Sequence, residues 1–455
     1  MLRSRKSNLL LRTIAPLLLL AMQSGLWAFI WIRFYADIVP DPFYWKGQLL
    51  LVSLYFILLS AISNFYSGFR IGFFRATEVA LSNMIALVLT NIITYLQACL
   101  IIVSIVTPFP ILAMTAIQCI IAVFWAFITN RIYTRSSKPH RMLMLYDGTK
   151  PVDALINKLH TRPDKYKIED TLCVAETDFD TVCARISDFD AVILRGLSSD
   201  LCHHIQRFCF EHSIRSYIVP DIEALLIHGA EEINLFDTPL LLNRNDEQKN
   251  DQRMVKRIFD IVFSVSALIV LLPFSLITAL AIKIEDGGPV FYSQERLTVG
   301  GKSFMLYKFR SMKVNAEKAG AQLSPQNDDR ITAVGRVIRS IRLDEIPQFF
   351  NVLKGDMSIV GPRPERPEIA EEYQKTMPEF VYRLKVKAGL TGYAQVYGNY
   401  NTDPWDKLLM DMIYISNFSL MMDLKIVLMT FKILLQRRRT EGVALDHRQW
   451  RNKGE

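Results

Sequence analysis

The residues best suited to chemistry lie in one segment, RLDEIPQFFNVLKGDMSIVGPRP, which runs from Arg342 to Pro364. Adjacent Asp344 and Glu345 precede Pro347, and proline is favoured in the first turn of a helix. The two carboxylates are therefore expected at or just before a helix N-terminus, where unpaired amides and the helix dipole favour anions. There an ionised Asp344 could act as a nucleophile, and Glu345 could hold a divalent cation. The segment predicts phosphate chemistry, with a plain helix cap as the alternative.

Four further blocks stand around this segment in a fixed order. They are KRIFDIVFSVSALIVLLPFSLITALAIKIEDGGPVFYSQER from Lys256, YKFRSM from Tyr307, GLTGYAQVYG from Gly389 and DMIYISNFSLMMDLKI from Asp411. The five ordered blocks are spread over almost the whole of residues 253–436, and so many matches in order are a far stronger signal than one short motif. This half of the chain resembles the bacterial polyprenyl-phosphate sugar-1-phosphate transferases, also called monotopic phosphoglycosyl transferases. The upstream half resembles the long form of that family.

The resemblance implies an enzyme that transfers hexose-1-phosphate from a UDP-hexose to undecaprenyl phosphate, which yields undecaprenyl-diphosphate-sugar and UMP. It implies Asp344 as the catalytic nucleophile that carries the phosphosugar covalently, and Glu345 as its catalytic neighbour and a ligand of the cofactor Mg²⁺. Galactose and glucose are the favoured sugars, and an N-acetylated hexosamine stays open. Such a step would begin capsule, exopolysaccharide or O-antigen synthesis. The alternative is a catalytically inactive membrane scaffold or regulator of polysaccharide assembly.

Four basic residues are expected to bind the phosphate oxygens of the substrates: Lys308, Arg310, Arg342 and Arg363. Arg363 stands between two prolines, and its planar guanidinium suits bidentate contact with a phosphate. Contact with lipid headgroups is the alternative role for these cations. Asp411 is a candidate second metal ligand, or else a helix cap.

Composition fits a membrane enzyme built from several parts. The chain has 455 residues, of which 51% are hydrophobic, and a net charge of +8. Two basic regions, 1–140 and 251–455, flank an acidic region, 141–250, and basic regions favour an anionic cytoplasmic leaflet. Membrane lipids are thus expected partners. Nucleic acid is not, because no nucleic-acid-binding signature accompanies the basic residues.

Residues 1–140 are expected to form a four-helix transmembrane bundle, with spans at about 14–34, 48–68, 79–106 and 109–131. Lys, Arg, Asp and Glu are absent from 13–32 and from 79–130, and the second stretch is long enough for two spans. Basic residues precede the first span, lie between the second and third, and follow the fourth, which places both ends in the cytoplasm. We therefore expect a multi-pass protein of the bacterial inner membrane whose active site faces the cytoplasm. A homodimer is compatible with this layout.

Residues 141–250 are expected to form a small cytosolic α/β domain, and the resemblance implies that it is Rossmann-like. Short apolar runs at 142–146, 191–196 and 216–220 predict strands, and polar helical stretches separate them. The first turn reads YDGTKPVDAL, with one glycine where a dinucleotide fingerprint needs three, so a bound dinucleotide is not expected. A cluster of Cys and His between Cys202 and His212 has no common zinc-finger spacing and is interpreted as ordinary helix.

Residues 251–455 are expected to form a mainly α catalytic domain with interfacial helices near its end. The apolar run from Ile261 to Ile282 is long enough to be a fifth span. The resemblance instead implies a re-entrant membrane helix at about 254–284, with its kink at Pro273, that returns to the cytoplasmic face. Aromatic, apolar and charged residues are mixed between Trp405 and Gln436, which is typical of helices lying in the interface.

Overall fold

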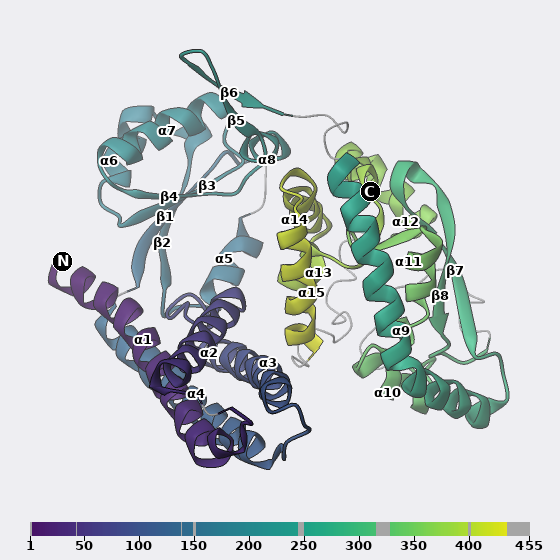
Figure 1. Ribbon diagram of the computed structural model, residues 1–455. Coiled ribbons are helices and arrows are strands. Elements are labelled where there is room, and N and C mark those ends of the chain that lie inside the picture. The colour runs from purple at the N-terminus through teal and green to yellow at the C-terminus, as the bar shows by residue number, and fades with distance from the viewer. Residues whose placement is uncertain are drawn as a thin grey trace. The chain divides into compact units, whose positions relative to one another are not determined.

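The computed structural model describes residues 2–41, 43–137, 139–148, 152–243, 250–314, 328–398 and 402–434. Its contacts divide the chain into two compact units, Met1–Val219 and Pro220–Glu455 (Figure 1). The first unit contains long apolar helices followed by an α/β domain, and the second contains the predicted catalytic and substrate-binding residues. The mixed helical and α/β architecture predicted from the sequence is confirmed. The three domain boundaries drawn from the sequence stay predictions.

Four long helices begin the first unit and pack side by side (Figure 1). Their bounds are α1 Leu2–Phe34, α2 Trp45–Phe65, α3 Ala76–Ile102 and α4 Phe109–Ser136, with a short 3₁₀ turn, η1, at Ala36–Ile38. Each is long and apolar enough to cross a membrane, and the predicted spans agree with them to within a few residues. The chain is a membrane protein. Inside these helices, Asn91 and Gln118 bond each other and Tyr55, so hydrogen bonds between helices satisfy much of the polarity that the apolar stretches bury.

The α/β domain has a four-stranded parallel sheet in the order β2-β1-β3-β4. Helices α6 and α7 pack on one face of the sheet and α5 on the other. The middle strands β1 and β3 are buried apolar runs, as the sequence predicted. Strand β2 was missed because its sequence, YKIEDTLC, alternates exposed polar side chains with half-buried ones. The elements are β1 His140–Tyr146, α5 Asp153–His160, β2 Tyr166–Cys173, η2 Val174–Glu176, α6 Phe179–Ile186, β3 Ala191–Arg195, α7 Ser199–Glu211 and β4 Arg215–Ile218.

The second unit is mainly helical, with three two-stranded sheets, β5-β6, β7-β8 and β10-β9, among its described residues. Its first elements are α8 Ile222–His228, β5 Glu231–Leu235, β6 Thr238–Leu242, α9 Asn250–Asp286, β7 Phe291–Leu297, η4 Val299–Gly301, β8 Ser303–Phe309, α10 Ala333–Ser340 and η5 Leu343–Glu345. They are followed by α11 Gln348–Lys354, β9 Met357–Val360, α12 Pro367–Thr376, η6 Pro378–Lys385, β10 Ala388–Thr391, α13 Tyr393–Tyr397, α14 Pro404–Ser416 and α15 Leu420–Leu434.

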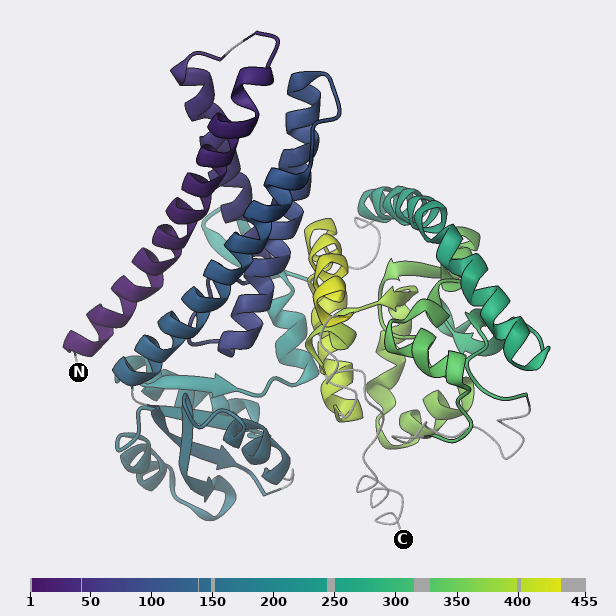
Figure 2. The same cartoon turned by 90° about the horizontal axis from the view of Figure 1, so that it is seen from below.

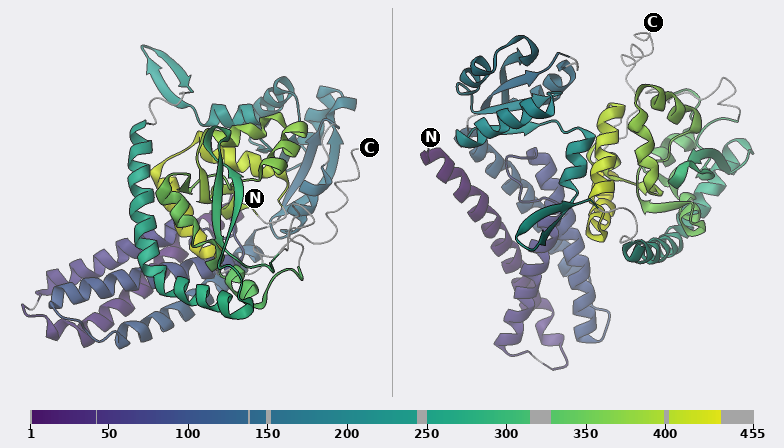
Figure 3. Two further views of the ribbon diagram at one scale, coloured as in Figure 1. Left: turned by 90° about the vertical axis from the view of Figure 1, so that its right-hand side faces the viewer. Right: turned by 90° about the horizontal axis from the view of Figure 1, so that it is seen from above.

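Helix α9 is the fifth helix long and apolar enough to cross a membrane. Pro273 lies inside it, and the ribbon of this helix bends part-way along (Figures 2 and 3). Proline is the ordinary cause of such a bend, because it lacks the amide proton and its ring collides with the preceding turn. Most of its apolar side chains are exposed within the unit, including Ile269, Val270, Leu276 and Ile277 at 63–68%. This surface is available to lipid.

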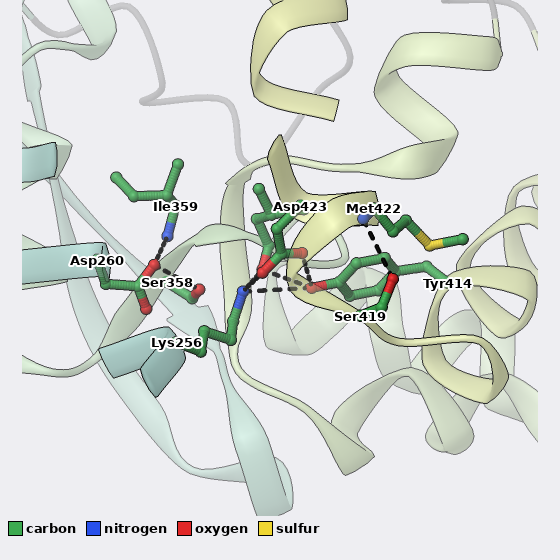
Figure 4. A network of polar contacts seen from close by, with 9 residues as sticks. Lys256, Asp260, Ser358, Ile359, Tyr414, Ser419, Met422 and Asp423 are labelled. Atoms are coloured by element: carbon green, nitrogen blue, oxygen red, sulfur yellow. Dashed lines mark hydrogen bonds and ion pairs between the residues drawn. The ribbon is translucent and has the colours of Figure 1, made fainter. Parts of the chain in front are cut away.

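The first turns of α9 are tied to the rest of the unit by buried polar contacts (Figure 4). Lys256 Nζ lies 2.5 Å from Asp423 Oδ2 and donates to Val360 O at 3.0 Å. Tyr414 donates to Asp423 Oδ1 at 2.8 Å. One turn further on, Asp260 accepts hydrogen bonds from the Ser358 hydroxyl and the backbone of β9. Helix α9 is therefore anchored to β9, α14 and α15 at one end.

Candidate active site

Asp344 and Glu345 occupy the 3₁₀ turn η5, directly before Pro347 and α11. The predicted placement at a helix start is confirmed. Their carboxylates make no cap hydrogen bond to α11, so the plain cap does not account for them. Asp344 is 7% exposed, and within the described residues its carboxylate accepts no hydrogen bond. The turn begins at Arg342, whose backbone adopts the left-handed conformation with φ 56°. Residues other than glycine seldom adopt this conformation.

Three cations from different parts of the chain converge on Glu345. Lys308 Nζ lies 3.4 Å from Glu345 Oε1 and Arg363 NH2 lies 3.5 Å from the same oxygen. Arg342 NH1 lies 3.9 Å from Oε2. The structure thus brings five of the predicted site residues together. All three distances exceed the 2.7–2.9 Å usual for a charge-assisted hydrogen bond, so this is a loose cluster.

Lys308 reaches the cluster because β8 is fastened to α11. The Asn351 side chain accepts from the backbone of Tyr307 at 3.0 Å and donates to Met305 O at 2.7 Å. Asn351 is fully buried, so these bonds replace the water that its amide loses on folding. They set the register of β8 against α11, which places Lys308 opposite Glu345. Sequence reasoning missed this role, although an amide among the apolar residues of a short helix is a recognisable signal.

Arg363 is positioned by a tightly held loop after β9. The Gly361 amide donates to Thr391 O, and Pro362 O accepts from the Gly389 amide, both at 2.9 Å. A Cβ at Gly361 would lie 2.3 Å from Lys387 O, so only glycine fits against β10 here. Arg383 donates to Arg363 O at 3.1 Å. The backbone of the Pro-Arg-Pro sequence is thus fixed while the Arg363 side chain stays 48% exposed.

Burial and the nearby charges separate the two carboxylates in acidity. Burial raises the pKa of Asp344 to about 6, and the negative charge of Glu345 raises it further. The positive charges of Lys308, Arg339 and Arg363 act in the opposite direction. Burial also acts to raise the pKa of Glu345, but Lys308, Arg363 and Arg342 outweigh it and lower that pKa to about 2. Glu345 is therefore ionised at every ordinary pH, whereas Asp344 gains its charge near pH 6.

The remaining predicted residues lie in other contacts. Arg310 pairs with Asp286, and its Nε and NH1 are buried without a hydrogen-bond partner in the described part of the chain. Asp411 lies inside α14, 1% exposed, and accepts from Arg383 Nε at 2.7 Å. It neither caps a helix nor joins the cluster around Glu345. Pro273 is in the bend-bearing helix α9.

Arg296 and Arg383 are supporting residues that the sequence did not reveal. Arg296 donates to Pro364 O at 3.3 Å, and burial with the nearby charge of Arg363 lowers its pKa to about 10. Arg383 is 7% exposed and joins Asp411 to the backbone of Arg363. Both arginines act on the backbone of the Pro-Arg-Pro sequence. Arg383 stands next to apolar residues in the sequence, whereas Arg296 follows Gln294 and Glu295 and gave no such signal.

The donor set can be tested against Mg²⁺, which proteins usually hold through one or two carboxylates together with substrate phosphates. Glu345 is ionised and fits such a site. Asp411 does not fit, because Arg383 occupies its carboxylate. Within the described ranges, no group of three His, Cys, Asp or Glu side chains could hold a metal ion through the protein alone. A substrate would have to supply most of the ligands.

Comparison with known proteins assigns this region. A family model described as "Bacterial sugar transferase" matches residues 251–437. A UDP-glucose:undecaprenyl-phosphate glucose-1-phosphate transferase of Caulobacter vibrioides is 40% identical over 185 residues, which are 40% of this chain and 69% of that protein. The chain belongs to the bacterial sugar transferase family. The five ordered blocks and the cluster around Glu345 lie inside the region that the family model matches.

Two longer members of the bacterial sugar transferase family match as well. The UDP-N-acetylgalactosamine-undecaprenyl-phosphate N-acetylgalactosaminephosphotransferase of Aeromonas hydrophila is 46% identical over 184 residues, which are 40% of this chain and 44% of that protein. The undecaprenyl-phosphate galactose phosphotransferase of Salmonella typhimurium is 37% identical over 254 residues, or 52% of each chain. The match thus spans about half the length of these two relatives. Their names give two different sugars.

Proposed function

We propose that this protein transfers hexose-1-phosphate from a UDP-sugar to undecaprenyl phosphate, with undecaprenyl-diphosphate-sugar and UMP as products. The observation that carries the proposal is the meeting of Glu345, next to Asp344, with the three cations Lys308, Arg342 and Arg363. A negatively charged diphosphate suits this excess of cations. The names of the relatives, all undecaprenyl-phosphate sugar phosphotransferases, support the same substrates.

In the proposed reaction, ionised Asp344 attacks the phosphorus that carries the sugar. A bond forms between a carboxylate oxygen and phosphorus, and the bond to the UMP oxygen breaks with its electron pair leaving on UMP. An oxygen of undecaprenyl phosphate then attacks the same phosphorus, and Asp344 departs as carboxylate. The raised pKa of about 6 still leaves Asp344 ionised near neutral pH, and a buried carboxylate with few hydrogen bonds is a stronger nucleophile than a solvated one.

The cations of the site act on charge during this reaction. Lys308 and Arg342 hold Glu345 and the donor diphosphate, and Arg363 presents its exposed guanidinium to phosphate oxygens. Glu345 would hold Mg²⁺ in this proposal, and the ion would neutralise charge that develops on the departing phosphate. Arg310 has two buried nitrogens that lack a hydrogen-bond partner among the described residues. In this proposal it is a further hydrogen-bond donor to the phosphate oxygens. Asp411 is left out of the metal site because it is paired with Arg383.

The lipid acceptor requires the site to lie at a membrane surface. We infer that α9 is re-entrant, with Pro273 at its kink, and that the active site faces the cytoplasm at the inner membrane. The bend in α9 and its anchoring through Lys256 and Asp260 support this path (Figures 3 and 4). Helices α1–α4 are then a transmembrane bundle, and the parallel sheet is a Rossmann-like cytosolic domain. Proximity of the lipid substrate in the leaflet favours the second transfer.

The experiment is UMP release from purified, lipid-embedded protein with Mg²⁺ and undecaprenyl phosphate. UDP-glucose, UDP-galactose and UDP-N-acetylgalactosamine are compared as donors, because the relatives are named for all three sugars. We expect release with one donor, loss in Asp344→Asn, and no loss in Asp153→Asn, the same change at an exposed carboxylate of the α/β domain. Silence with every UDP-sugar would favour the scaffold instead.

The covalent route has its own test. Without lipid acceptor, labelled UMP should exchange into the UDP-sugar, because the phosphosugar waits on Asp344 and can return to UMP. A direct transfer from donor to lipid permits no such exchange. UMP release that requires lipid, with no exchange in its absence, would retain the transferase and reject the intermediate.

A further inference from the structure

A cluster of cations and aromatic rings joins the membrane helices to the α/β domain in the first unit. We name it the Phe73 cluster: Arg12, Phe73, Tyr133, Arg162 and Lys165. Lys165 Nζ lies 4.0 Å from the centre of the Phe73 ring, and the Arg12 guanidinium carbon lies 5.1 Å from it. Arg12 also donates to the Tyr133 hydroxyl at 2.8 Å, and Arg162 donates to Phe73 O at 2.9 Å. The cluster is thus built from α1, the α2–α3 connection, α4 and the turn before β2.

The Phe73 cluster holds more positive than negative charge. Arg162 takes Asp164 in a two-point ion pair, with both distances 3.0 Å. Neither Arg12 nor Lys165 has an acidic partner within 4.0 Å in the part of the chain that the structure describes. The Arg12 Nε is buried there without a hydrogen-bond partner. Burial lowers the pKa of Lys165, and the positive charges of Arg162 and Arg12 lower it further. Tyr133 and Asp164 act in the opposite direction.

Cations that lie close together and partly shielded from water repel each other, and a bound anion offsets that repulsion. The Phe73 cluster offers a set that suits a phosphate: a guanidinium with an unpartnered N–H, an ammonium and a tyrosine hydroxyl. Cation–aromatic contacts at Phe73 hold the two charged groups in place. The charge of Glu78 joins that of Asp164 in raising the pKa of Arg162.

The position of the Phe73 cluster indicates which phosphate it would meet. The candidate span of α1 begins at Leu11, next to Arg12, and α3 begins at Ala76, three residues after Phe73. The depth of these residues is therefore that of the headgroups. Phe73 itself is 51% exposed, as aromatic side chains at a membrane interface often are. We propose that the Phe73 cluster binds the phosphate of an anionic phospholipid headgroup.

A lipid bound there would strengthen the junction between the two parts of the first unit. Its phosphate would bridge Arg12 of α1 and Lys165 of the α/β domain, beside the bonds that Arg162 and Arg75 already make across this junction. The α/β domain would thereby be held against the membrane surface. None of the residues of the Phe73 cluster lies in the second unit, which contains the proposed active site.

The test uses the full-length protein in a neutral detergent, with phosphatidylglycerol, phosphatidylcholine or inorganic phosphate added. We expect phosphatidylglycerol alone to raise the unfolding temperature, by roughly 3 °C, and to be retained in native mass spectra. Lys165→Gln and Arg12→Gln should lose most of this rise, and Lys165→Arg should keep it because the charge remains. Lys167→Gln is the matched control, since Lys167 is 63% exposed and already pairs with Glu169.

Two results would overturn the proposal. One is an unchanged rise and unchanged lipid retention in both glutamine variants. The other is an equal rise with inorganic phosphate, which would assign the cluster to a soluble anion. The conservative Lys165→Arg variant guards against loss through misfolding, because it should fold and respond as the wild type does.

Discussion

Two buried carboxylate clusters in the second unit are neutralised in different ways. Around Asp423, which is 1% exposed, Lys256 lies at 2.5 Å and the Tyr414 hydroxyl at 2.8 Å, so each oxygen has a close partner (Figure 4). Around Glu345, three cations stand at 3.4–3.9 Å, and neighbouring Asp344 has no hydrogen bond from the described residues. The first cluster is closed, whereas in the second three cations lie loosely around Glu345.

The difference separates a structural joint from a site. A closed pair has satisfied its charges and gains nothing from another ion, whereas a cation-rich cluster beside an unpaired carboxylate can accept an anion and react with it. The Asp423 cluster fixes α9 to the core. The Glu345 cluster gathers three cations at longer distances, as the proposed diphosphate site requires.

The largest expected effect is on activity at the open cluster. Asp344→Asn should lower kcat by on the order of 10³-fold or more, because a nucleophile is lost. Its unfolding temperature at pH 7.5 should equal or exceed that of the wild type. The folded-state pKa of Asp344 is raised, so its stabilising contribution is present below the unfolded value and is lost as pH rises through about 6. A large fall in unfolding temperature would place Asp344 with the structural residues.

The closed cluster should show the opposite behaviour. Asp423→Asn leaves Lys256, whose side chain is only 15% exposed, without its counter-ion and should cost about 3 kcal/mol of stability, seen as a lower unfolding temperature in detergent. The exposed pair of Arg185 and Asp170 is the control, since Asp170→Asn should cost less than about 1 kcal/mol. Equal effects at the two pairs would contradict the distinction.

Arg363→Lys keeps the charge near Glu345 but removes the planar fork. We expect kcat/KM for the UDP-sugar to fall about 10- to 100-fold, the size of a charge-assisted hydrogen bond, with unfolding temperature unchanged. Lys354→Gln serves for comparison, because Lys354 is 65% exposed and pairs with Asp356 away from the cluster. Wild-type kinetics in Arg363→Lys would show that only the charge matters.

The smallest effect concerns the pH profile. UMP release in the first half-reaction should fall as pH drops through about 6, where Asp344 takes up a proton. Glu345 helps to raise that pKa, so in Glu345→Gln the midpoint should move below 6, whatever the remaining rate. A midpoint that stays in place would mean that another group titrates.

Much of the fold and part of the site could be predicted from the sequence. The apolar spans, the strands β1 and β3 and the start of α11 followed from uninterrupted local patterns. Strand β2 could not, because the polar side chains of YKIEDTLC hide a strand whose pairing with β1 depends on distant residues. Asp411 was assigned to a metal because its partner Arg383, 28 residues away, has no local signal.

The sequence by itself determined the family, the nucleophile candidate and the membrane character, since each depends on residue type and short-range spacing. Only the tertiary structure decided which cations meet Glu345, because Lys308 and Arg363 arrive through Asn351 and the Gly361 loop. It alone gave Asp344 its raised pKa, which is a property of burial. Burial and charge pairing are set by segments far apart in the chain, and no local pattern encodes them.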